Sequence, residues 1–63
     1  MKVSFCRSVM NSEGQFYEAS IFSVVMPSDM GEQVAIAAAA DTLQKELKVV
    51  RWEDVAEYYT ITK

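Results

Sequence analysis

The side chains that could do covalent chemistry are few, and they lack partners. The chain has no histidine, so the commonest general base and metal ligand is missing. Cys6 is the single cysteine, and its thiol would need a nearby cation to become a nucleophile. Arg7 follows it, but neighbouring residues on a strand point to opposite faces. We therefore expect Cys6 to be a packing residue, and we predict no catalytic, cofactor-binding or metal-binding residues.

Charged side chains form two clusters near the end of the chain. The acidic cluster comprises Glu53, Asp54 and Glu57. It could bind a cation or a basic partner, but its spacing is not that of a calcium loop, and a solvated acidic edge is the simpler interpretation. The basic cluster comprises Lys45, Lys48 and Arg51. It could contact phosphate, although positive charge at a helix C-terminus also complements the helix dipole.

Composition and charge narrow the class of protein. With 51% hydrophobic and 24% charged residues in a chain of 63, we expect one folded α+β domain over residues 1–63. A net charge of −3 makes nucleic-acid binding an unlikely role. The longest apolar-rich stretch, residues 34–40, is too short to span a membrane. One cysteine cannot form an internal disulfide, and the first residues lack the apolar core of a signal peptide, so we expect a cytoplasmic protein.

A β-hairpin is predicted at the start of the chain. Residues 2–10 alternate between apolar and polar side chains, as in a strand. Residues 11–15 are typical of a turn, and a three-residue loop ending at Gly14 would place glycine at a left-handed position. This loop sets a register in which Val9 lies opposite Tyr17, Arg7 opposite Ala19, and Phe5 opposite Ile21.

One helix and a third strand are predicted after Pro27. We expect the helix over residues 29–47, with either Asp29 and Glu32 as a capping box or Ser28 as the cap. Residues 49–55 could be a short strand or one helical turn, whereas residues 56–62 are typical of a strand. The predicted fold is ββαβ, with a three-stranded antiparallel sheet in the order 2-1-3 and one helix packed on one face.

The predicted register leaves large apolar side chains on the face of the hairpin that the helix does not cover. Such a small domain hides only about 60% of the surface that its unfolded chain exposes, so it gains stability from association. We therefore expect a homodimer, formed through this face or through edge strands. The residues predicted to contact a second copy or another partner are Met10, Phe16, Phe22, Val24, Met26, Trp52 and Tyr58.

These observations favour a non-catalytic protein–protein interaction module, such as a small regulator or inhibitor that acts as a homodimer on an unidentified protein. Two alternatives stay open. One is a small-ligand or enzymatic site at a dimer interface, lined by Cys6 and tyrosines. The other is a nucleic-acid-associated accessory protein, which would need the basic residues to converge on one surface.

Overall fold

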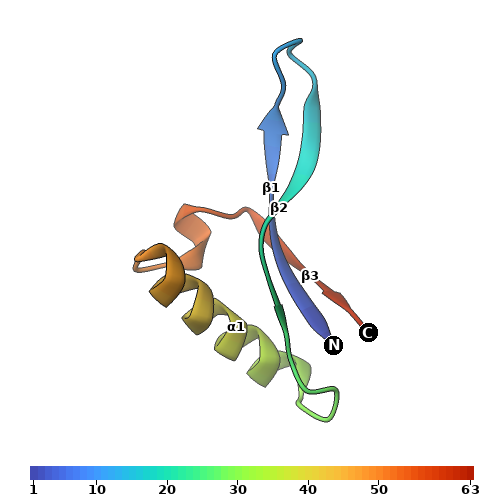
Figure 1. Ribbon diagram of the computed structural model, residues 1–63, viewed down its shortest axis with the longest axis vertical. Helices are drawn as coiled ribbons and strands as arrows, with labels where there is room; N and C mark the ends of the chain where they lie inside the picture. Colours follow the sequence, from blue (N-terminus) through green and yellow to red (C-terminus); the bar gives the residue numbers. More distant parts are fainter.

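The computed structural model describes residues 1–63 and has the element order ββαβ, with a short 3₁₀ helix before the last strand. Strands β1 (Lys2–Met10), β2 (Phe16–Val25) and β3 (Tyr58–Thr62) form one antiparallel sheet in the order β2-β1-β3. The α+β class and the predicted strand order are confirmed. Helix α1 (Glu32–Leu47) lies beside one end of the hairpin, and the other end of the hairpin extends away from it (Figure 1).

The hairpin turn has the predicted geometry. Gly14 has a φ of 82°, the left-handed conformation that favours glycine. Asn11 closes the loop: its amide donates to the carbonyl of Gln15 at 2.8 Å, and its side-chain Oδ1 accepts from the amides of Glu13 and Gln15 at 2.9 Å each. The predicted pairs Val9 with Tyr17 and Arg7 with Ala19 are confirmed.

The register prediction is wrong beyond Cys6, because β2 carries a β-bulge. Phe5 pairs with Phe22 and Cys6 with Ser20, so Ile21 is an extra residue without a partner in β1. A bulge inserts one residue and inverts the alternation of the strand that follows. Phe22 and Val24 therefore lie on the same face as Phe5. They do not lie on the reverse face, which is the face of the sheet opposite to Phe5.

The apolar pattern of β2 explains why the bulge forms at this position. Tyr17, Ala19 and Ile21 alternate in one phase, whereas Phe22 and Val24 alternate in the other. The bulge at Ile21 brings the two phases to the same side. Ile21, Phe22 and Val24 are all partly buried and pack against the core, which a regular strand could not achieve.

The core is small and joins β1 to the helix. Its buried residues are Val3, Phe5, Ala35, Ala39, Leu43 and Ala56. The alanines of α1 are small, and small side chains allow a close approach between elements. Only seven of the 63 residues are buried, so the fold has few buried apolar side chains to stabilise it.

Helix α1 begins later than predicted. Its N-cap is Gly31, with no side-chain capping hydrogen bond, so the capping box of Asp29 and Glu32 does not form. The residues before it are used in a turn instead, in which the amide of Met30 donates to the carbonyl of Pro27 at 3.2 Å. The helix ends at Leu47 as predicted, and Lys48 follows in the left-handed conformation with a φ of 56°.

The ambiguous segment before β3 forms a single helical turn. Residues Trp52–Asp54 are a 3₁₀ helix, η1. The indole ring of Trp52 lies 5.2 Å from the ring of Phe5 and 5.9 Å from that of Tyr59, measured between centroids. Trp52 therefore contributes to the core side of the sheet and does not cover the reverse face. The chain contains no helix with the length and hydropathy needed to cross a membrane.

Candidate functional site: an exposed hairpin arm

The distal half of the hairpin stands apart from the rest of the fold. Strand β3 pairs with β1 only from Lys2 to Cys6, so beyond Cys6 the sheet has two strands. We call residues 7–19 the hairpin arm. None of them belongs to the core cluster or packs against it. The arm accounts for the elongated shape of the molecule, 42 Å by 26 Å by 14 Å, and is visible above the helix in Figure 1.

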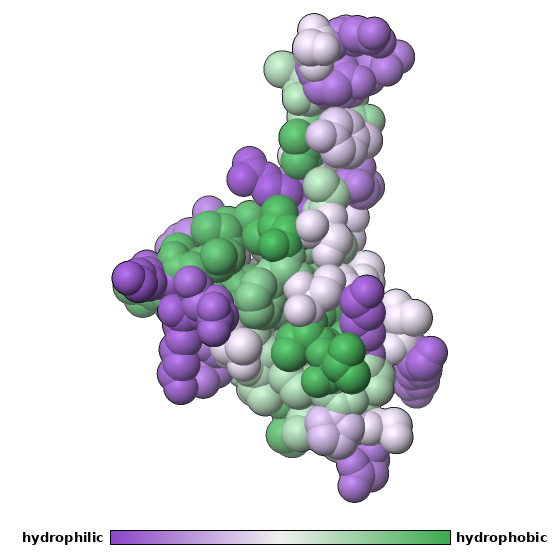
Figure 2. Space-filling model, viewed as in Figure 1, coloured by the Kyte–Doolittle hydropathy of each residue, from purple (hydrophilic) through white to green (hydrophobic).

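Large apolar side chains lie on both faces of the arm. Val9 is opposite Tyr17, and on the other face Met10 is opposite Phe16. Phe16 is 72% exposed, Met10 59% and Tyr17 51%. Figure 2 shows a narrow projection with a hydrophilic tip and hydrophobic spheres directly below it. A two-stranded ribbon is only marginally stable in water. Exposed apolar side chains along it therefore indicate a surface that is stabilised when a binding partner removes it from water.

Two carboxylates link the arm to residues 57 and 58, where the last strand begins. Oε1 of Glu57 accepts a hydrogen bond from the amide of Ser8 at 2.7 Å. On the arm, Oε2 of Glu18 accepts one from the hydroxyl of Tyr58 at 2.6 Å. This hydrogen bond is the main cause that raises the pKa of Tyr58 from 10.0 to about 12, with smaller contributions from desolvation and from the negative charge of Glu18. Hydrogen bonds to an ionised carboxylate are stronger than hydrogen bonds between neutral groups. These two hydrogen bonds therefore hold the arm in its direction relative to the sheet.

The reverse face of the sheet is polar rather than apolar. Its central hydroxyls form a chain, in which Ser23 donates to Ser4 at 3.0 Å and shares a hydrogen bond of the same length with Ser20. Cys6 lies on this face and is buried, and its thiol is 3.9 Å from the carbonyl of Ser4. The expectation of a large apolar reverse face is therefore wrong along the body of the sheet.

The structure separates the predicted interface residues into three groups. Met10 and Phe16 form an exposed cross-strand pair on the arm. Phe22, Val24, Met26 and Trp52 are partly buried against the core. Tyr58 lies at the base of the arm and is 37% exposed. Of the predicted residues, Met10 and Phe16 belong to the arm and Tyr58 lies at its base. Tyr17 is a further exposed aromatic residue of the arm, which the predicted set omitted.

The charged clusters do not form a common site. Lys45 pairs with Asp41 at 2.9 Å and Arg51 with Glu53 at 3.3 Å, so both cations lie beside carboxylates. In the acidic cluster, Glu57 binds the backbone of β1. No three side chains of the types that bind metals come close enough together to hold an ion.

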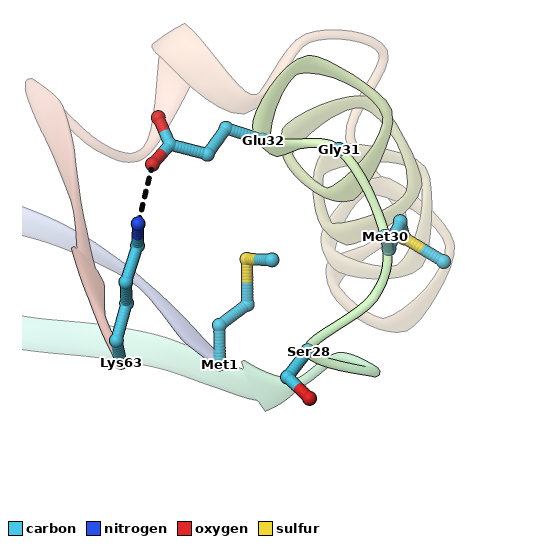
Figure 3. Close-up of a pocket in the computed structure, with 6 residues that line it drawn as sticks. All are labelled: Met1, Ser28, Met30, Gly31, Glu32 and Lys63. Carbon is cyan, nitrogen blue, oxygen red and sulfur yellow. Dashed lines mark ion pairs between the residues drawn. The ribbon is translucent and has the colours of Figure 1, made fainter.

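One pocket is present, far from the arm. Its volume is about 310 Å³, and it lies between the chain termini and the start of α1. Figure 3 shows the side chain of Met1 standing inside it and Met30 pointing away. Lys63 and Glu32 form an ion pair of 3.5 Å across its rim. The lining offers two thioethers, one hydroxyl from Ser28, and a cation and a carboxylate that are already paired with each other.

Comparisons with known proteins add no relative: no protein-family model, curated protein or solved structure matches this chain.

Proposed function

We propose that this chain is a non-catalytic protein–protein interaction module that binds its partner through the hairpin arm. The observation that carries the proposal is the exposure of Met10, Phe16 and Tyr17 on a projection that contacts none of the core. Aromatic side chains and methionine are enriched where proteins bind one another. A small chain that presents two aromatic side chains and a methionine on a projecting arm is suited to act as a small regulator or inhibitor of a larger protein.

Self-association is the second form of the proposal. Apolar side chains on both faces of the arm favour a homodimer, because the arm of one copy could cover a face of the arm of the second copy. Light scattering at micromolar concentration tests this form, and a mass of 7.1 kDa at all concentrations would contradict it. The proposed setting is the cytoplasm, whose reducing conditions would keep the single thiol free.

The test compares partner capture by three forms of the full chain. One is unchanged, one carries Met10→Ser with Phe16→Ser, and the matched control carries Val50→Ser. Val50 is 87% exposed but lies after α1, away from the arm. We expect the unchanged chain and the control to retain the same protein from a lysate of the natural host, and the arm variant to lose it.

Equal retention of that protein by all three forms would contradict the proposal, and so would recovery of no protein above background. Circular dichroism of each form shows that the fold is intact, which separates a lost contact from a lost structure.

A further inference from the structure

We infer that the outer edge of β2 along the arm, residues 16–20, accepts an extended strand of another protein that carries alternating basic and apolar side chains. This inference rests on the proposed function and names the chemistry of the partner.

The backbone of β2 presents unpaired donors and acceptors along the arm. Strand β2 lies at the edge of the sheet, with β1 on its inner side only. The amide of Asn11 donates to the carbonyl of Gln15, which shows that Gln15 faces β1. Because backbone groups of an antiparallel pair alternate with a period of two residues, Phe16 and Glu18 direct their amides and carbonyls outward. Only another extended backbone matches such a row of alternating groups.

The other edges of the sheet are better protected. Strand β3 is only five residues long. The open edge of β1 beyond Cys6 is blocked at Ser8, whose amide binds the carboxylate of Glu57. The bulge at Ile21 interrupts the half of β2 nearest the helix. Bulges, short strands and charged side chains are the usual protections of edge strands, and residues 16–20 have only Glu18 among them.

The charges around this edge favour a basic partner over a second copy. The arm carries two acidic residues, Glu13 and Glu18, and one cation, Arg7, which lies on the inner strand β1 opposite Ala19. Two copies paired through this edge would bring Glu18 of each close to that of the other, and like charges on paired strands are destabilising. A lysine opposite Glu18 would instead pair with it, while apolar side chains of the same strand would lie on the face of Tyr17.

Synthetic peptides of about seven residues, the length of an ordinary strand, test the inference on the full chain. The probe alternates lysine and valine, and a matched peptide replaces each lysine with glutamate. Two further probes carry N-methyl groups on the lysine amides or on the valine amides. In an antiparallel pair with lysine opposite Glu18, the lysine amides face β2 and the valine amides face solvent.

We expect the lysine peptide to bind at least about tenfold more tightly than the glutamate peptide at low ionic strength. Methylation of its lysine amides should abolish binding, and methylation of its valine amides should preserve it. Glu18→Gln, which keeps a hydrogen-bond acceptor for Tyr58, should weaken the lysine peptide about two- to fivefold. Glu46→Gln, which removes a charge from the exposed side of α1, should not.

Equal binding of the lysine and glutamate peptides, equal effects of the two methylation patterns, or no binding of any peptide would overturn the inference. It would also be overturned if the chain alone formed dimers in which the amides of Phe16 and Glu18 were protected from exchange. If the peptides fail while the Met10→Ser and Phe16→Ser variant still loses its native partner, the inference is wrong and the proposed function stands.

Discussion

The bulge in β2 predicts unequal losses of stability when two adjacent valines are truncated. Val24 lies on the face of Phe5 and packs against the core, whereas Val25 is 77% exposed. Without the bulge, Val25 would share the core face and Val24 would point away. Replacing each valine with alanine in turn therefore tests the register directly, because both changes remove the same atoms and the same strand propensity.

The size of the effect follows from the buried area. Val→Ala removes about two methylene equivalents, which contribute about 0.8 kcal/mol each when fully buried. With most of the side chain covered, Val24→Ala should lower the free energy of unfolding by about 1.2 kcal/mol. Val25→Ala, with only a quarter covered, should lower it by about 0.4 kcal/mol.

Urea unfolding followed by circular dichroism measures this difference. With a denaturant slope of about 1 kcal/mol/M for a chain of this size, the two midpoints should differ by about 0.8 M. If Val25→Ala lowers the midpoint as much as Val24→Ala does, or more, the bulged register is wrong.

Three further substitutions test other parts of the fold. Leu43→Ala should lower the free energy of unfolding by about 2–5 kcal/mol, because Leu43 is fully buried in a small core, and a thermal melt would measure it. Gly14→Ala should lower it by about 1 kcal/mol, since no atom lies within 4 Å of the added methyl group and only the left-handed φ of 82° opposes it; urea unfolding that shows no loss would contradict this. Ultraviolet titration should show one tyrosine, Tyr58, ionising near pH 12, and Glu18→Ala should return its pKa toward 10.0. Because folding raises this pKa, the stabilisation is complete below pH 10 and is lost as the pH rises to about 12.

The sequence predicts the elements and topology well because local signals agree. The alternation of β1, the glycine in the turn and the amphipathic stretch after Pro27 each indicate one element, and the length of the helix then determines where the last strand returns. The end of the helix is also predicted, but its start is not. Asp29 and Glu32 have the spacing of a capping box, yet Asp29 lies in the turn from Pro27 to Met30, and Gly31 is the N-cap in its place.

The arm could be predicted only in part. The sequence pattern predicts Met10 and Phe16 on an uncovered face together with Phe22 and Val24, but the bulge moves Phe22 and Val24 to the core side. The change of phase between Ile21 and Phe22 was the available signal, because two out-of-phase apolar patterns in one strand indicate an extra residue. The hydrogen bonds of Glu18 and Glu57 at the base of the arm could not be predicted, since they join residues separated by 40 and 49 positions in the sequence.

We propose that the outer edge of the arm is free in the isolated chain and is covered when a partner binds. Amide hydrogen exchange measured by NMR tests this most directly, at Phe16 and Glu18 for the outer edge and at Tyr17 and Ala19 for the edge that faces β1. We expect fast exchange at Phe16 and Glu18, slower exchange at Tyr17 and Ala19, and protection of Phe16 and Glu18 once the lysine–valine peptide is added. Slow exchange at Phe16 and Glu18 in the isolated chain, or no change on adding the peptide, would contradict it.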